Sequence, residues 1–137
     1  LSKPVDKSRL FRNMKEALYQ IQIESRPIPI QTKEGVVIRQ ADDVLLVEVQ
    51  GRKVTVTAVD QIFETVTPMR DWDFLLKIPS FFQTHRSYIV NMRYVASFTK
   101  DTVRLVGPNN LERIAYLTKR RYTDFKNTYL LYLESTR

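Results

Sequence analysis

The stretch Phe81-Phe82-Gln83-Thr84-His85-Arg86-Ser87-Tyr88-Ile89-Val90-Asn91 joins an aromatic pair, a polar segment and an apolar run in one continuous segment. The apolar run at 88–90 contains good strand formers that favour burial. The donors of residues 84–87 would stay unsatisfied in an apolar core. The stretch therefore predicts a loop that presents side chains to a polar ligand and then continues into the core as a strand. Asn91, which closes that strand, is expected to hydrogen-bond with the backbone.

The composition is that of a folded domain. Of the 137 residues, 43% are hydrophobic and 27% are charged, values typical of a folded soluble protein. The length suits one domain with a short appended element. The chain has no cysteine, which excludes disulfides, thiolate metal sites and cysteine nucleophiles. Its single histidine, His85, argues against a zinc site. We expect no cofactor and no metal.

No part of the sequence has the pattern of a membrane or export segment. Every apolar run is shorter than the roughly 18 to 20 residues that span a bilayer. The N-terminus also lacks the pattern of a signal peptide. We therefore expect a cytoplasmic protein that makes no membrane contact.

The positive charge is unevenly distributed. The net charge is +7, from 22 Lys and Arg against 15 Asp and Glu. Residues 1–26, 27–75 and 76–137 carry +3, −3 and +7, so the excess gathers in the part that begins near residues 84–87. This is the expected footprint of a protein that binds a polyanion such as nucleic acid. The alternative is a basic surface that only maintains solubility.

The N-terminal segment predicts a helix at residues 7–22, with Asp6 as its N-cap. Its apolar side chains recur at steps of three and four, and they are Leu10, Phe11, Met14, Ala17, Leu18 and Ile21. Its polar face carries Lys7, Arg9, Arg12 and Lys15. Pro27 and Pro29 prevent the helix from continuing, so residues 23–29 read as a linker.

From Ile30 onward the hydrophobic period changes to two, which is typical of strands. Gly35 and Gly51 lie at hairpin turns, where a positive φ is needed. A helix is expected from Pro68 to about Lys77, with Thr67 as its cap. The pattern predicts a mainly β fold, a sandwich or distorted barrel, with strands at 28–32, 36–39, 44–49, 54–58, 62–66, 88–91, 95–99, 103–106 and 112–117.

A last amphipathic helix is expected after Thr118, which is a suitable N-cap. The apolar residues at helical spacing are Tyr122, Phe125, Tyr129, Leu130 and Leu133. Lys119, Arg120 and Arg121 fall in the first turn, where the helix dipole disfavours cations. A phosphate or a base edge at that position would resolve the conflict.

The candidate binding residues lie at three basic turns and form no catalytic set. Ser87 is two residues from His85, but no orienting acid accompanies them, so we expect no enzyme activity. The turns carry Arg52 and Lys53, then His85 and Arg86, then Lys119, Arg120 and Arg121. Guanidinium groups match phosphate and the O6 and N7 atoms of guanine, so the combination favours nucleic acid.

The run Phe82-x-x-His85-Arg86-Ser87-Tyr88-Ile89-Val90-Asn91 resembles the LytTR DNA-binding domain of bacterial response regulators. The strand at 44–48 with its glycine turn, and the later run Thr118-Lys119-Arg120-Arg121-Tyr122, extend the resemblance over roughly residues 28–134. The resemblance implies an elongated multi-stranded β domain, with one short inserted helix, a C-terminal helix and an N-terminal helical arm. It also implies that loops enter successive major grooves in place of a recognition helix.

The resemblance assigns DNA-facing roles to all seven turn residues: Arg52, Lys53, His85, Arg86, Lys119, Arg120 and Arg121. Leu1-Ser2-Lys3-Pro4-Val5 and the helix after it look like the end of a phosphoacceptor receiver domain. The implied organisation is a receiver remnant and linker at residues 1–26 and a LytTR-like domain at 27–137. The helix at residues 7–22 would then mediate self-association or pack on the β domain.

The function expected from these features is sequence-specific binding of double-stranded promoter DNA by the output domain of a response-regulator transcription factor. The resemblance implies a homodimer on paired sites, with a receiver domain and a sensor kinase acting in the full-length protein. The alternative is a protein-interaction module that binds an acidic partner through exposed strands and the N-terminal helix.

Overall fold

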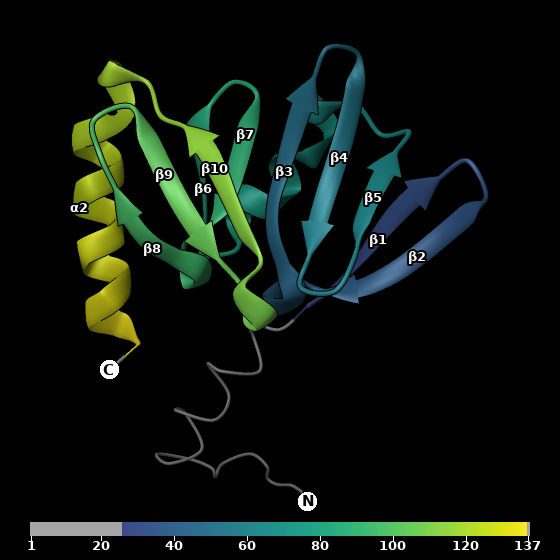
Figure 1. The fold of residues 1–137 in the computed structure, drawn as a ribbon, viewed down its shortest axis with the longest axis horizontal. Helices are drawn as coiled ribbons and strands as arrows, with labels where there is room; N and C mark the ends of the chain where they lie inside the picture. The colour runs from purple at the N-terminus through teal and green to yellow at the C-terminus, as the bar shows by residue number, and fades with distance from the viewer. Residues whose placement is uncertain (1–25, 137) are drawn as a thin grey trace, which may run out of the picture.

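The computed structural model describes residues 26–136 of the chain. The helix expected at residues 7–22 and the receiver remnant lie outside the described residues. Within them the chain is mainly β, as predicted, with ten strands, four short 3-10 helices and one α-helix (Figure 1). The strands are β1 (Pro27–Thr32), β2 (Gly35–Gln40), β3 (Val44–Gln50), β4 (Lys53–Ala58), β5 (Ile62–Thr65), β6 (Phe81–His85), β7 (Tyr88–Asn91), β8 (Val95–Phe98), β9 (Thr102–Val106) and β10 (Glu112–Tyr116).

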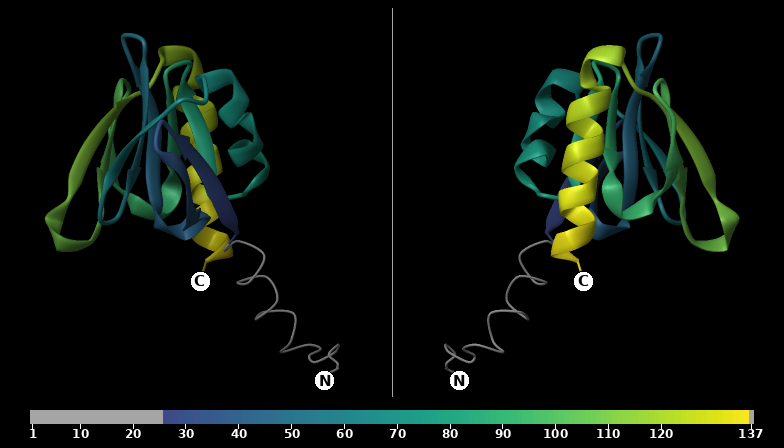
Figure 2. Two further views of the ribbon diagram at one scale, coloured as in Figure 1. Left: turned by 90° about the vertical axis from the view of Figure 1, so that its right-hand side faces the viewer. Right: turned by 90° about the vertical axis from the view of Figure 1, so that its left-hand side faces the viewer.

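The helical elements are short except for the last one. The 3-10 helices are η1 (Ala41–Asp43), η2 (Met69–Lys77), η3 (Met92–Tyr94) and η4 (Pro108–Asn110), and the α-helix is α2 (Lys119–Ser135). Figure 2 shows η2 and α2 on the same side of the molecule, away from β9 and β10. No helix among the described residues is long and apolar enough to cross a membrane.

The strands form three antiparallel sheets. The hairpin β1-β2 is one sheet, the order β5-β4-β3-β7-β6 is the second, and β10-β9-β8 is the third. Figure 1 shows the sheets following one another, from the β1-β2 hairpin at one end of the molecule to α2 at the other. The hairpin turns predicted at Gly35 and Gly51 are confirmed, and both glycines have positive φ.

The central sheet separates two hydrophobic cores. Val44 and Val47 of β3 belong to the core that also contains side chains of β1 and η2. Leu45 and Leu46 belong to the core formed with β9, β10 and α2. A register shift between Val44 and Leu46 in the pairing with β4 allows two successive leucines to serve the same core. Strand β3 therefore contributes side chains to both cores, one on each face of the central sheet.

The segment before the β6-β7 turn is a strand, whereas the sequence predicted a loop. Thr84 is fully buried, and its hydroxyl donates to the carbonyl oxygen of Tyr116 at 2.8 Å. That hydrogen bond satisfies the donor whose burial argued for a loop. The polar loop consequently shrinks to Arg86 and Ser87. Asn91 bonds with the backbone as expected, since its amide donates to the carbonyl oxygen of Val44 at 2.8 Å.

The inserted helix exists but differs from the prediction. Pro68, not Thr67, is its N-cap, and no side chain caps it. The carbonyl oxygen of Thr67 instead accepts a hydrogen bond from Nε1 of the buried Trp72 at 3.2 Å. Phe74 of the same helix is 38% exposed. The indole anchors this 3-10 helix to the central sheet.

The C-terminal helix begins as predicted, because the Thr118 side chain accepts a hydrogen bond from the backbone N–H of Arg121. Phe125 is fully buried, and Tyr129 packs against the same core. Leu130 and Leu133 were expected on that face as well. They are 50% and 40% exposed, because Tyr132 completes the packed face in their place.

Candidate nucleic-acid interface

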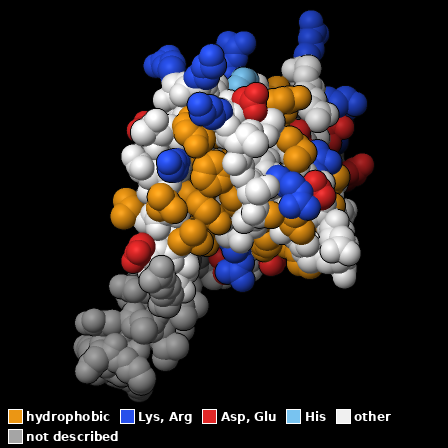
Figure 3. Space-filling view, turned by 60° about the vertical axis from the view of Figure 1, so that its left-hand side comes forward, with side chains coloured by type: hydrophobic (Ala, Val, Ile, Leu, Met, Phe, Trp, Pro, Cys, Tyr) orange, Lys and Arg blue, Asp and Glu red, His pale blue; other side chains and the backbone are white. Residues whose placement is uncertain are grey.

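The three basic turns lie along one edge of the molecule. In Figure 1 the β3-β4 turn, the β6-β7 turn and the start of α2 all lie at the upper edge. Figure 3 shows Lys and Arg side chains gathered there, with the histidine among them. The fold therefore brings together basic residues that are far apart in the sequence.

Backbone hydrogen bonds join the three turns. The N–H of Val49, at the end of β3, donates to the carbonyl oxygen of Ser87 at 2.9 Å. The N–H of Thr118, at the start of α2, donates to the carbonyl oxygen of Thr84 at 3.2 Å. The β6-β7 turn is thus bonded to both of its neighbours. Their relative positions are set by the backbone and not by flexible side chains.

The β6-β7 turn holds His85 in a defined orientation. The backbone N–H of Ser87 donates to Nδ1 of His85 at 3.0 Å, so this nitrogen is an acceptor and the ring proton lies on Nε2. The edge-on stacking of the imidazole on Tyr88, with centroids 5.8 Å apart, fixes the ring further. Tyr88 stacks in turn on Tyr116, with centroids 5.7 Å apart. Arg86, next along the chain, is exposed.

A buried ion pair lies beneath these turns. Glu48 of β3 is 2% exposed and opposes Tyr88 in the neighbouring strand β7. Its carboxylate accepts hydrogen bonds from the Arg113 guanidinium and, at 3.1 Å, from the Gln50 amide. Burial and the nearby charge of Glu48 raise the pKa of Tyr88 above its ordinary value. The pair ties the central sheet to the sheet that precedes α2.

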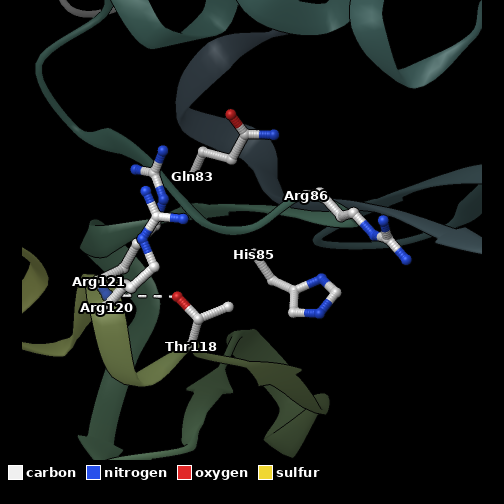
Figure 4. A pocket seen from close by; sticks show the side chains of 6 residues that line it. All are labelled: Gln83, His85, Arg86, Thr118, Arg120 and Arg121. Carbon is white, nitrogen blue, oxygen red and sulfur yellow. Dashed lines mark hydrogen bonds between the residues drawn. The ribbon is translucent and has the colours of Figure 1, made fainter.

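An open hollow of about 420 Å³ separates the β6-β7 turn from the start of α2. In Figure 4 the guanidinium groups of Arg120 and Arg121 lie on one side of His85, and that of Arg86 lies on the other. The hollow is lined by Gln83, His85, Arg86, Thr118, Arg120 and Arg121. Four of the seven residues predicted from the sequence therefore surround one space.

The remaining predicted residues lie beside this hollow and do not line it. Lys119 is exposed in the first turn of α2. Arg52 and Lys53 are exposed on the β3-β4 turn, next to Gly51 at φ 62°. The residue contacts at this turn are those of a simple hairpin, with Gln50 paired to Lys53.

The cations of this edge form no ion pairs with the residues that the structure describes. Within residues 26–136, the ion pairs that form use Arg39, Arg70, Arg104 and Arg113. None of these arginines belongs to the three basic turns. Guanidinium and ammonium groups without internal partners keep all their donors for an anionic ligand.

Two further residues contribute to this edge, and the sequence reasoning missed them. Gln83 lines the hollow from β6, and its only sequence signal is its spacing of two from His85. Lys100 is exposed in the β8-β9 turn. The carbonyl oxygen of Asp101 in that turn accepts from the N–H of Leu117 at 2.9 Å, which places the turn beside the start of α2.

Comparisons with known proteins point to one family. The sequence matches the family model described as the LytTr DNA-binding domain over residues 34–130. The transcriptional regulatory protein NatR of Bacillus subtilis (strain 168) is 27% identical over 104 residues, which cover 74% of this chain and 45% of NatR. The chain thus spans less than half the length of this relative.

A solved structure supports the same fold. A LytTr DNA-binding domain from Bacillus cereus matches with a TM-score of 0.57 and 21% identity, over 76% of this chain and 95% of that chain. The family match includes β2 through most of α2, and therefore all three basic turns. The chain belongs to the family of LytTr DNA-binding domains.

Proposed function

We propose that this domain binds double-stranded promoter DNA sequence-specifically, by placing its basic edge in the major groove. The observation that carries the proposal is the joining of three cationic turns by backbone hydrogen bonds, with no ion pairs at those turns among the described residues. Such an edge presents several fixed positive groups to a phosphate backbone at once. It also requires little reordering when DNA binds.

The residues of the edge have different roles in this proposal. Arg86 is the first candidate for a base contact, with His85 beside it, because the surrounding hydrogen bonds fix their turn. The other basic residues hold phosphates or base edges, and they are Arg52, Lys53, Lys119, Arg120 and Arg121. The start of α2 adds a helix N-terminus, which favours an anion there.

The packing of α2 supports base recognition by the turns and not by this helix. Its buried face rests on the core through Phe125 and Tyr129, and its first turn faces the hollow. The N-terminal end of the helix, and not its side, therefore lies at the basic edge. An arrangement of this kind suits a phosphate contact better than a helix lying along the groove.

The regulatory setting is also part of the proposal. We assign residues 27–137 to the DNA-binding output domain of a cytoplasmic response regulator, and residues 1–26 to the end of a receiver domain and a linker. A receiver and a sensor kinase would control the output by phosphorelay, and the domain would bind paired sites as a homodimer. The name of NatR, a transcriptional regulatory protein, supports this setting.

Selection of bound duplexes from a random pool, followed by titration against salt, tests the proposal. The selected duplex is expected to bind at least about 10³-fold more tightly than a random duplex at physiological salt. Its affinity should fall steeply as the salt concentration rises. Equal affinity for both duplexes, or tighter binding to an acidic polypeptide than to the selected duplex, would overturn it.

A further inference from the structure

The outer face of α2 carries an apolar surface that no described residue covers. Leu131 is 70% exposed and Leu130 is 50% exposed. Together with Asn127, Leu133 and Glu134 they line an open hollow of about 580 Å³. Figure 3 shows hydrophobic side chains gathered on the side of the molecule that carries α2. We call the set formed by Asn127, Leu130, Leu131 and Glu134 the leucine stripe.

The helix geometry separates the leucine stripe from the core. Its members recur at steps of three, one and three, so they share one face of the helix. Phe125, Tyr129 and Tyr132 pack on the hydrophobic core from the opposite face. The stripe is therefore not an extension of the domain's own core. Exposed apolar patches are common places for a partner to bind.

The chain itself carries a complementary segment. Residues 7–22 have the sequence pattern of an amphipathic helix, with an apolar face that needs a partner and a polar face rich in Lys and Arg. Asp124 shares the face of α2 that carries the stripe, three positions before Asn127 and seven before Leu131. Its carboxylate would complement a basic helix lying along the leucines.

The described chain begins at the same end of the molecule as the C-terminal part of α2. The carbonyl oxygen of Arg26 accepts from the N–H of Ala41 at 2.6 Å, so the described chain starts at η1. In Figure 1 this point and the C-terminal end of α2 both lie opposite the basic edge. A helix over residues 7–22 would be roughly 24 Å long.

From these observations we infer that the leucine stripe is the docking site for residues 7–22 of the same chain. The apolar face of that segment covers Leu130 and Leu131, and its basic face lies near Asp124. The docked segment leaves the basic edge free, because the stripe and that edge lie at different places along α2. Whatever precedes residue 7 in a longer protein is then held at the end of the domain opposite the proposed DNA edge.

Hydrogen exchange on the 1–137 chain tests this inference. We expect the amides of residues 7–22 to be protected in the parent chain and to exchange at the rates of an unstructured chain in the L130D/L131D variant. The matched control is V36D/I38D, which changes two exposed apolar residues of β2 and should leave the protection intact. Amides around Phe125 report whether α2 remains folded. No protection in the parent, or equal loss in both variants, overturns the inference.

A disulfide experiment distinguishes docking within one chain from contact between two copies. The chain has no native cysteine, so A17C/N127C introduces a single pair, and A17C/I38C provides the control pair. A tethered pair reacts at an effective concentration of order mM, so at micromolar protein the intramolecular disulfide should dominate. The expected product is a monomer with one disulfide, formed in the first pair and not in the control. Disulfide-linked dimers, or equal yields in both pairs, overturn the inference.

Discussion

The β6-β7 turn and the β3-β4 turn carry the same kind of charge in different surroundings. The first is bonded to both neighbours through Thr84 and Ser87, and it holds the His85 ring through a hydrogen bond. The second is a hairpin turn around Gly51, where an added Cβ would find open space on every side. The first turn is held from both sides, whereas the tip of the second projects into open space.

In the proposed complex, this difference would separate two kinds of contact with DNA. Base reading requires a donor at a fixed position, because a base edge presents its acceptors at defined points in the groove. A phosphate contact tolerates a mobile cation, since charge neutralisation is insensitive to small displacements. We therefore assign sequence specificity mainly to the β6-β7 turn, which we call the fastened turn. We assign affinity mainly to the β3-β4 turn, which we call the open turn.

The largest effect is expected from breaking the ion pair that underlies the fastened turn. R113A leaves the Glu48 carboxylate buried without its cation, which should lower the free energy of unfolding by about 3 kcal/mol. The matched control is R104A, since the Arg104–Glu112 pair is 45% and 47% exposed and should contribute no more than about 1 kcal/mol. Urea denaturation measures both values. Similar losses in the two variants would show that Glu48 does not depend on Arg113.

The next effect concerns the candidate base contact. R86A should weaken binding to the selected duplex by about 1–3 kcal/mol and reduce the preference over random duplexes. R70A removes a side chain of η2 that is 85% exposed and should change neither value. Fluorescence anisotropy titrations with both duplexes provide the measurement. If R86A keeps both affinity and preference, the fastened turn does not read bases.

A smaller effect is expected from the hydroxyl that anchors β6. T84V keeps the shape of the side chain but removes the bond to Tyr116, which should cost about 1 kcal/mol of stability. T57V is the control, because the Thr57 hydroxyl is buried and has no partner among the described residues. Its removal should be neutral or stabilising. Thermal unfolding measures both variants. A lower melting temperature for T57V than for T84V would contradict the role given to the Thr84 hydroxyl.

The smallest effect is expected at the open turn. K53A should weaken all duplexes alike and lower the slope of log affinity against log salt concentration by about 1. K33A, on the exposed β1-β2 turn, is the matched control and should leave the slope unchanged. Titrations of selected and random duplexes over a salt series measure this. A loss confined to the selected duplex would instead assign base reading to Lys53.

The hairpins and the residues of the basic turns were accessible from the sequence because their signals are local. The strand predicted at 44–49 is Val44–Gln50, and the one at 54–58 is Lys53–Ala58. Alternating apolar residues and a glycine at the turn define such a hairpin without reference to the rest of the chain. The cap at Thr118 is equally local.

The features that the sequence did not predict depend on distant partners. Thr84 lies in a strand because its hydroxyl finds a carbonyl 32 positions away. Glu48 is buried because Arg113, 65 positions away, neutralises it. Leu130 has the spacing of a core residue, but the aromatic side chains of α2 occupy the core instead. The assembly of the three turns into one edge likewise rests on a hydrogen bond within the central sheet and on another between that sheet and the start of α2.

The hydrogen bond from Ser87 to His85 also limits what the imidazole recognises. With Nδ1 occupied, the ring offers only the Nε2 proton, so it acts as a donor and not as an acceptor. In the proposed DNA contact, its partners would be N7 of a purine, O6 of guanine or O4 of thymine, while the amino groups of adenine and cytosine would find no acceptor there. Cytosine would then be the one base that offers His85 no partner in the major groove.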